Sequence, residues 1–297
     1  MAESIPIFCA TDENYAPFAA LMMKSVLMHT KSFVDFYVMD GGIKKKTKKL
    51  IAKDLKKYRN KKVHYVDMTK YDLSQFPDVS YFTVNMYSRF FIPLIAPALK
   101  KAIYLDVDII VKKDISALYN EDLGPYPLGA VIEENDCNAN YLRRVYPPFQ
   151  GRYFNSGVLL YDIQKMREMN FVEKVIALTK EYRNRVAFPD QDILNILFMD
   201  NYKKLNEVYN INCGWIRMLK KRRPELFPID PVVIHYVGLK PWEGHTFYFQ
   251  DFEDVLKTSV FLKGIVEKYR TKKVSRYYLF GFIPLFKTSV KKELWKN

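Results

Sequence analysis

Short apolar runs alternate with amphipathic helical patterns along this chain, and that alternation restricts the folds open to it. The strand-like runs in the first part of the chain are 5–10, 33–40, 62–67 and 102–111. The helical patterns between them are 17–29, 44–58 and 85–99. Strands separated by helices pair in parallel, and the helices cover both faces of the sheet. The sequence therefore predicts an α/β fold with a mostly parallel central sheet.

The second half of the chain continues the pattern as far as about residue 265. Further strand-like runs are 127–133, 153–162 and 232–237, and further helical patterns are 163–184 and 190–200. The composition changes near residue 266, where basic and aromatic residues begin to dominate. We therefore expect two parts, a globular α/β domain over 1–265 and a C-terminal tail over 266–297.

Two carboxylates, Asp106 and Asp108, interrupt the apolar run "AIYLDVDIIV" at 102–111. Burying an unpaired carboxylate is costly, so both side chains need a partner. Other polar side chains lie at or near strand ends, where ligands of open α/β sheets collect: Asp12, Asn14, Glu133 and His235. Asp oxygens suit hard cations, and an imidazole shifts the preference from Mg²⁺ toward Mn²⁺. The sequence predicts a divalent cation, Mn²⁺ with Mg²⁺ as the alternative.

Charge and cysteine content narrow the setting of the protein. The formal net charge is +14, which favours an anionic partner. The three cysteines are far apart and odd in number, so a disulfide scaffold is not supported. The N-terminus lacks the basic and apolar regions of a signal peptide. The cysteine content and the N-terminal sequence together predict a reducing compartment such as a cytoplasm.

Six motifs occur in an order that resembles glycosyltransferase family 8, especially the bacterial lipopolysaccharide α-galactosyl- and α-glucosyltransferases. They are "FCATDENY" (8–15), "NMYSRFFIP" (85–93), "YLDVDIIV" (104–111), "FNSGVLLYDI" (154–163), "DQDILN" (190–195) and "IHYVGLKPW" (234–242). The resemblance implies a GT-A fold, which is Rossmann-like. It also implies a UDP-sugar donor, Mn²⁺, and transfer of the sugar with retention of anomeric configuration.

The resemblance also implies a role for each matching residue. Asp106, Asp108 and His235 resemble the three metal ligands. Around the donor, the matching residues are Ala10, Asp12 and Asn14 for uracil and ribose, Arg89 for a donor contact, Asn155 and Gly157 near the transferred sugar, Asp190 for sugar hydroxyls, and Gly238 with Lys240 for the diphosphate. Glu133 is a further candidate for donor binding, although it does not match the family residue at its position. Gln191 resembles the residue on the β-face of the anomeric carbon. Its carbonyl is a poor nucleophile, which favours same-face displacement over a covalent glycosyl-enzyme.

Two departures from the lipopolysaccharide galactosyltransferases affect the sugar and diphosphate pockets. Glu133 stands where those enzymes have Asp, and the spacing from His235 to Lys240 is one residue shorter. The choice between UDP-galactose and UDP-glucose therefore stays open.

The tail predicts contact with an anionic surface. Residues 268–297 carry nine basic residues and one acidic residue, interleaved with aromatic side chains. Aromatic residues settle at the headgroup level of a membrane, and each Lys or Arg near an anionic surface adds about 1 kcal/mol. We expect the tail to bind peripherally to the inner face of a bacterial cytoplasmic membrane, where a lipid-linked saccharide acceptor is found.

Three other functions fit parts of the sequence. A haloacid-dehalogenase-like phosphatase also uses two Asp residues one position apart, although its pair follows the first strand. A nucleic-acid-binding protein would account for the charge, but no recognised binding motif is present. A glycogenin-like self-glucosylating initiator belongs to the same family and needs an acceptor Tyr near the site.

Overall fold

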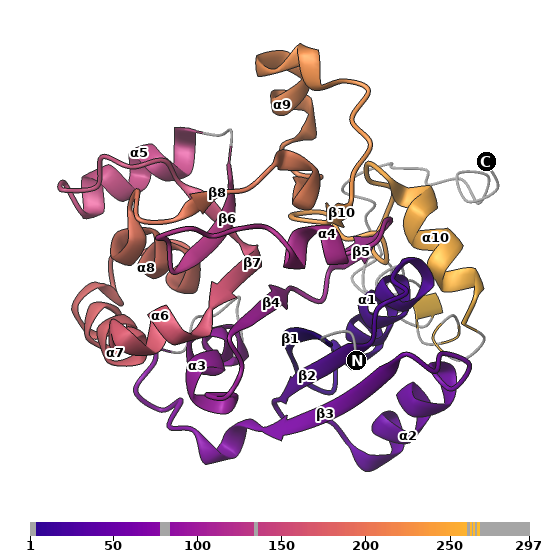
Figure 1. Ribbon diagram of the computed structural model, residues 1–297. Helices are drawn as coiled ribbons and strands as arrows, with labels where there is room; N and C mark the ends of the chain where they lie inside the picture. Colours follow the sequence, from indigo (N-terminus) through magenta and orange to yellow (C-terminus); the bar gives the residue numbers. More distant parts are fainter. Residues whose placement is uncertain are drawn as a thin grey trace, which may run out of the picture.

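The computed structural model describes residues 4–77, 84–133, 136–259, 262, 264, 266 and 267, and its centre is a seven-stranded sheet (Figure 1). The strand order is β3-β2-β1-β4-β7-β6-β8. The bounds are β1 Ile5–Thr11, β2 Val34–Asp40, β3 Lys61–Asp67, β4 Lys101–Leu105, β6 Leu128–Ile132, β7 Phe154–Asp162 and β8 Lys203–Lys204. Only β7 runs antiparallel to its neighbours β4 and β6. The predicted mostly parallel sheet is confirmed.

A second sheet of three strands stands beside the first. Its order is β5 (Ile109–Val111), β10 (Val233–His235) and β9 (Ile211–Asn212). The single strand predicted at 102–111 is therefore wrong, because β4 ends at Leu105 and β5 belongs to the second sheet. A continuous strand would point the side chains of Asp106 and Asp108 to the same face of a sheet that is covered on both sides. The break instead places them at the junction of the two sheets.

Helices cover both faces of the main sheet (Figure 1). The α-helices are α1 Ala16–His29, α2 Lys45–Asp54, α3 Ile92–Ile95, α4 Ser116–Tyr119, α5 Asp136–Val145, α6 Ile163–Glu168, α7 Phe171–Tyr182, α8 Pro189–Phe198, α9 Ile216–Arg222 and α10 Phe249–Lys257. Short 3₁₀ segments cover Met68–Lys70, Val84–Phe91, Glu207–Tyr209 and Pro224–Leu226. Among the described residues, no helix is long and apolar enough to cross a membrane.

Two predicted helices differ in detail from the observed ones. The helix predicted at 85–99 is a 3₁₀ segment followed by the single turn α3, whose second residue is Pro93. Pro97 also lacks an N–H, so a longer α-helix could not form its hydrogen bonds there. The helix predicted at 163–184 divides into α6 and α7 at Asn170, whose φ of 53° is left-handed.

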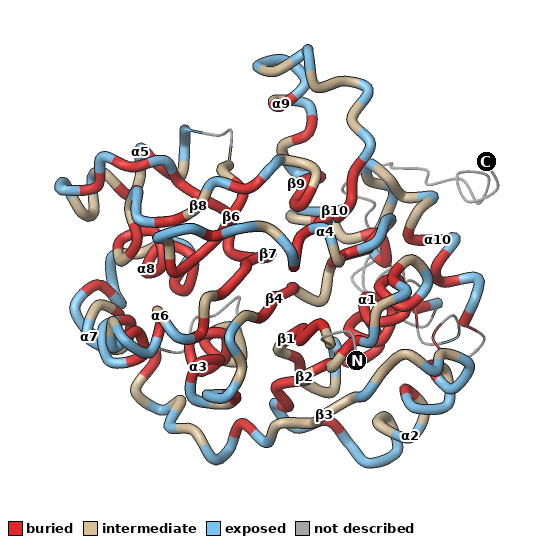
Figure 2. The backbone as a smooth tube through the Cα atoms, in the orientation of Figure 1, coloured by how far each residue is buried: buried red, intermediate tan, exposed pale blue. Residues whose placement is uncertain are grey.

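The core forms two layers, one on each face of the main sheet, and Figure 2 shows the buried strands between the helices. Strand β1 supplies both layers, because Ile7 and Cys9 belong to one cluster and Phe8 to the other. The predicted tail lies outside the described residues apart from Val266 and Glu267. Val266 is buried in the core.

Candidate active site

The antiparallel strand β7 explains why distant motifs meet at one edge of the main sheet. Strands β4 and β6 end at this edge, and β7 begins there, with Leu105 opposite Val158 in the register. Asn155 and Gly157 therefore lie beside Asp106, whose N–H donates to the Gly157 carbonyl at 2.8 Å. The strand assignment excludes a simple turn at 155–157. Because Glu133 follows β6, its carboxylate reaches the same edge.

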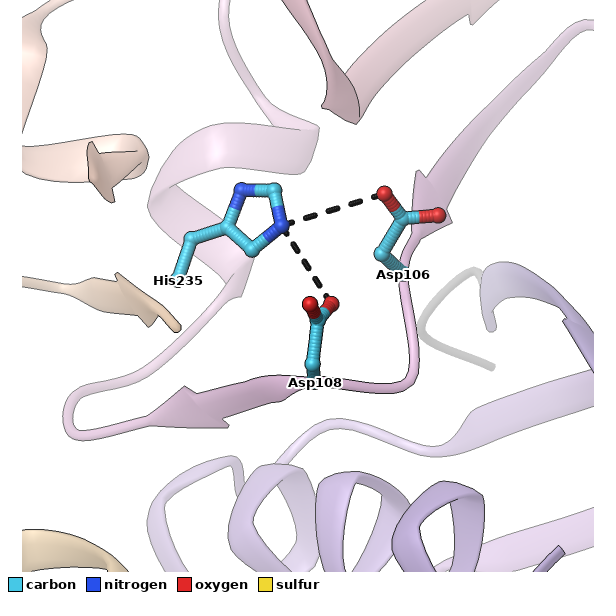
Figure 3. A group of neighbouring side chains, drawn as sticks. All are labelled: Asp106, Asp108 and His235. Atoms are coloured by element: carbon cyan, nitrogen blue, oxygen red, sulfur yellow. Dashed lines mark ion pairs between the residues drawn. The ribbon is translucent and has the colours of Figure 1, made fainter. Parts of the chain in front are cut away.

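Asp106, Asp108 and His235 form a cluster suited to a metal ion (Figure 3). One ligand atom from each residue lies within 4.8 Å of the other two. His235 Nε2 is 3.3 Å from Asp108 Oδ1 and 3.8 Å from Asp106 Oδ2. Two carboxylates and one imidazole are a donor set that Mn²⁺ accepts, so the side chains fit a divalent cation. The convergence predicted for these three residues is confirmed.

Arg89 links two carboxylates of the site from a buried position. Its Nη2 is 2.8 Å from Asp106 Oδ1, and its Nη1 is 3.0 Å from Asp190 Oδ2. The Tyr104 hydroxyl also donates to Asp106 Oδ1 at 2.8 Å. Asp106 therefore divides its oxygens, with Oδ1 held by Arg89 and Tyr104 and Oδ2 turned toward His235. Burial raises the pKa of Asp190, although Arg89 acts in the opposite direction.

Lys240 approaches the cluster from the segment after β10. Its ammonium group is paired with Asp108 Oδ2 and donates to the Tyr236 carbonyl at 2.8 Å. Gly238, with φ at 81°, provides the left-handed turn between β10 and Lys240, a conformation that a residue with Cβ rarely adopts. Burial alone would raise the pKa of Asp108, but the Lys240 ammonium group acts in the opposite direction, and the pKa of Asp108 is held below its usual value.

Buried amides and Glu133 form a network beside the metal-type cluster. Asn155 Nδ2 donates to Glu133 Oε1 at 2.9 Å and to Gln191 Oε1 at 3.1 Å. Gln191 Oε1 also accepts from the N–H of Ser156 at 2.9 Å, so its carbonyl is turned into the protein. Burial raises the pKa of Glu133, while its hydrogen bond from Asn155 lowers it.

The predicted nucleotide loop follows β1. Ala10 is partly buried near the end of β1, and Asp12 Oδ1 accepts from the N–H groups of Asn14 and Tyr15 at 2.9 and 3.0 Å. Asn14 is exposed. Trp242 stacks on Phe18 with ring centroids 3.7 Å apart, so Trp242 is a packing residue that joins the segment after β10 to α1.

Sequence reasoning missed Asn210, which contacts the imidazole of His235. Its Oδ1 is 3.0 Å from His235 Nδ1, and its Nδ2 donates to Asn155 Oδ1 at 2.9 Å. Nothing local marks Asn210, because it lies between a 3₁₀ turn and the two-residue strand β9. Tyr104 and Ser156 were also missed as site residues, although both lie inside recognised motifs.

Fold and site together define a glycosyltransferase of the GT-A type. The structure of galactosyltransferase LgtC in complex with donor and acceptor sugar analogs superposes with a TM-score of 0.75 at 26% identity, over 86% of this chain and 96% of that one. The sequence model described as "Glycosyl transferase family 8" matches residues 6–246, and the chain belongs to that family. Family membership does not favour the phosphatase or the nucleic-acid-binding function.

Two bacterial relatives extend the comparison. General stress protein A of Bacillus subtilis is 30% identical over 260 residues, which cover 82% of this chain and 89% of that protein. Lipopolysaccharide 1,2-glucosyltransferase of Escherichia coli K12 is 25% identical over 307 residues, which cover 95% of this chain and 89% of the other.

Proposed function

We propose that the chain transfers a hexose, galactose or glucose, from a UDP-sugar to a saccharide acceptor of the lipopolysaccharide or lipooligosaccharide type. The observation that carries the proposal is the cluster of Asp106, Asp108 and His235, with Lys240 beside it. Breaking the bond between sugar and UDP leaves negative charge on the diphosphate. A cation held by the cluster, together with Lys240, would neutralise that charge where it develops.

The other residues of the site divide between nucleotide and sugar. Ala10, Asp12 and Asn14 line the uracil and ribose, and Arg89 orients Asp106 and Asp190 around the donor. The proposed sugar contacts are Glu133, Asn155, Gly157, Asp190 and Gln191. Gly238 and Lys240 close on the diphosphate, so Lys240 exchanges Asp108 for a phosphate oxygen when the donor binds.

Retention of configuration is part of the proposal, through same-face displacement. Asp190 is already paired with Arg89, and the Gln191 carbonyl accepts hydrogen bonds from Asn155 and Ser156. Neither group is an activated nucleophile, which supports displacement without a covalent glycosyl-enzyme. The anomeric proton coupling of the product, measured by NMR, tests the assignment. A β-linked product from an α-linked donor would contradict it.

A lipid-linked acceptor on the inner face of a bacterial cytoplasmic membrane fits the proposed reaction. The support is the name of the lipopolysaccharide glucosyltransferase relative and the basic, aromatic composition of residues 268–297. Because most of the tail lies outside the described residues, its contact with a membrane is proposed from composition.

A thermal-shift screen of nucleotide-sugars tests the donor class. A ligand at a hundredfold excess over its dissociation constant stabilises the folded protein by about 2.7 kcal/mol. We expect UDP-galactose or UDP-glucose to raise the melting temperature with Mn²⁺ and to have little effect with chelator. GDP-mannose serves as the matched control. Equal shifts with every nucleotide-sugar, or none with the UDP-sugars, would contradict the proposal.

A further inference from the structure

A one-way chain of hydrogen bonds leads away from the metal-type cluster through buried side chains. It begins at His235 Nδ1, the ring nitrogen that faces away from Asp106 and Asp108 (Figure 3). It continues through Asn210 and Asn155 to Gln191, whose Nε2 donates to the Tyr153 hydroxyl at 3.0 Å. Tyr153 then donates to a carboxylate oxygen of Asp192 in α8 at 2.6 Å, where the chain ends.

Backbone groups fix the orientation of two amides in this chain. The N–H of Gly157 is 2.9 Å from Asn155 Oδ1, and the N–H of Ser156 is 2.9 Å from Gln191 Oε1. A backbone N–H only donates, so the atom facing it in each amide is the oxygen. Asn155 Nδ2 consequently faces Glu133 and Gln191, where it finds two acceptors.

The orientation of Asn155 determines that of Asn210. Because Asn155 Oδ1 only accepts, Asn210 must turn its Nδ2 toward it, and the observed distance is 2.9 Å. Asn210 Oδ1 then lies 3.0 Å from His235 Nδ1. A carbonyl oxygen has no proton to give, so Nδ1 carries the proton of a neutral imidazole and Nε2 presents its lone pair to the cluster.

The two residues are held together by strand register and burial. Asn210 directly precedes β9, in which Ile211 pairs with Ile234 and Asn212 pairs with His235. Asn210 is 4% exposed and His235 is 3% exposed, so water does not replace the bond between them.

We infer that Asn210 is a positioning residue, which selects the tautomer and ring orientation of His235 that metal binding requires. Histidines that bind metals commonly donate their other N–H to a partner, and loss of that partner typically weakens metal affinity about 10–100-fold. The effect on metal affinity rests on the proposed function, in which the cluster binds a metal ion. The tautomer of His235 depends only on the hydrogen bonds within the chain.

Two substitutions at position 210 separate positioning from general stability. Asn210→Leu removes the acceptor for His235, and we expect Mn²⁺ affinity to fall about 10–100-fold. Asn210→Asp keeps an acceptor for His235 but cannot donate to Asn155. We expect it to preserve Mn²⁺ affinity although it lowers thermal stability. The control is Asn60→Leu, which removes two hydrogen bonds to the carbonyls of Thr30 and Ser32, away from the site.

The decisive measurement is NMR of metal-free full-length protein with ¹⁵N-labelled histidine rings, with the His235 signal assigned by its absence in His235→Gln. The pH is raised until the ring is neutral, and the nitrogen that keeps its proton is read directly. We expect Nδ1 in the unmodified chain and in Asn210→Asp, and a mixture of tautomers in Asn210→Leu.

A proton on Nε2 in the unmodified chain would overturn the inference, whether or not either variant folds. Equal loss of Mn²⁺ affinity in Asn210→Leu and Asn210→Asp, measured by Mn²⁺ electron paramagnetic resonance, would also overturn it. If the unmodified chain carries the proton on Nδ1 but binds no Mn²⁺, the hydrogen-bond assignment stands and the proposed function fails.

Discussion

The backbone of Gly157 lies directly against the imidazole of His235. A Cβ at position 157 would overlap His235 Cε1 and lie 2.8 Å from Asp106 Oδ2. The contact leaves room only for glycine, and it brings the start of β7 against the end of β10. The close approach explains why a glycine stands between Ser156 and Val158 in this buried strand.

Gly157→Ala is therefore expected to displace His235 and to lower turnover about 100-fold, since a shift of about 1 Å in a catalytic site has that effect. Steady-state transfer from the UDP-sugar measures it. The matched control is Gly244→Ala, where the nearest atom to an added Cβ is 3.9 Å away. Comparable losses in both variants would argue against a steric role specific to position 157.

Removal of the metal should abolish transfer, because the diphosphate would then leave without its main neutralising charge. Asp106→Asn removes the carboxylate charge but keeps an oxygen for Arg89 and Tyr104. We expect Mn²⁺ affinity to fall by more than the roughly 100-fold typical of outer partners. Isothermal titration calorimetry measures the affinity. Asp35→Asn is the control. Asp35 also pairs with a histidine, since its Oδ1 is 3.0 Å from His64 Nε2, but Asp35 lies on β2 and is not part of the metal-type cluster. Full activity in chelator would rule out the metal.

Lys240→Met should change metal and nucleotide affinities in opposite directions. In the ligand-free protein Lys240 is paired with Asp108, so its removal frees a carboxylate for Mn²⁺. With the donor bound, the same residue is expected to contact the diphosphate. A charge-assisted hydrogen bond contributes about 1.5–3 kcal/mol, so we expect UDP to bind roughly tenfold or more weakly. Calorimetric titrations with Mn²⁺ alone and with UDP measure the two affinities. Weaker Mn²⁺ binding in the variant would contradict the proposal that Lys240 exchanges Asp108 for a phosphate oxygen.

Glu133→Gln should change how stability depends on pH. Burial raises the pKa of Glu133, so the folded protein holds the proton to higher pH than the unfolded chain. The stabilisation that comes from binding this proton is complete below the usual pKa of 4.5. It is lost as the pH rises through the higher pKa of Glu133 in the folded protein. The Gln variant does not titrate. Its free energy of unfolding, relative to that of the unmodified protein, should therefore increase as the pH rises above 4.5. Urea unfolding over a pH series measures the difference, and a constant difference would contradict the assignment.

Truncation after Glu267 should release the protein from anionic vesicles while turnover of a soluble acceptor stays nearly unchanged. The cut spares Leu262 and Val266, which are buried in the core. The removed segment carries nine basic residues, each worth about 1 kcal/mol near an anionic surface. Vesicle sedimentation measures the binding.

The matched control for the truncation replaces Lys45, Lys46 and Lys49, which are exposed on the body of the protein in α2, with Gln. This variant should bind vesicles nearly as well as the unmodified chain. Equal vesicle binding by the truncated and complete proteins would contradict the membrane role of the tail.

The sequence by itself determined the alternation of strands and helices and the identity of the metal-type residues. Strands β1 to β4 could be predicted because each corresponds to a short apolar run. Such a run can be recognised in the sequence without knowing which distant residues it contacts. Asp106, Asp108 and His235 could be grouped because strands in such a sheet end at a common edge. The motif order then supplied Arg89, Asp190 and Gln191.

Only the tertiary structure decided how these residues are connected. The break after Leu105 depends on pairing between β5 and β10, more than 100 positions apart in the chain. Asn210 contacts Asn155 across 55 positions and His235 across 25, and Lys240 reaches Asp108 across 132. The register of β9 against β10 sets the first two contacts, and the turn at Gly238 sets the third. No local pattern encodes these pairings, because a hydrogen bond between distant side chains depends on where packing places both backbones.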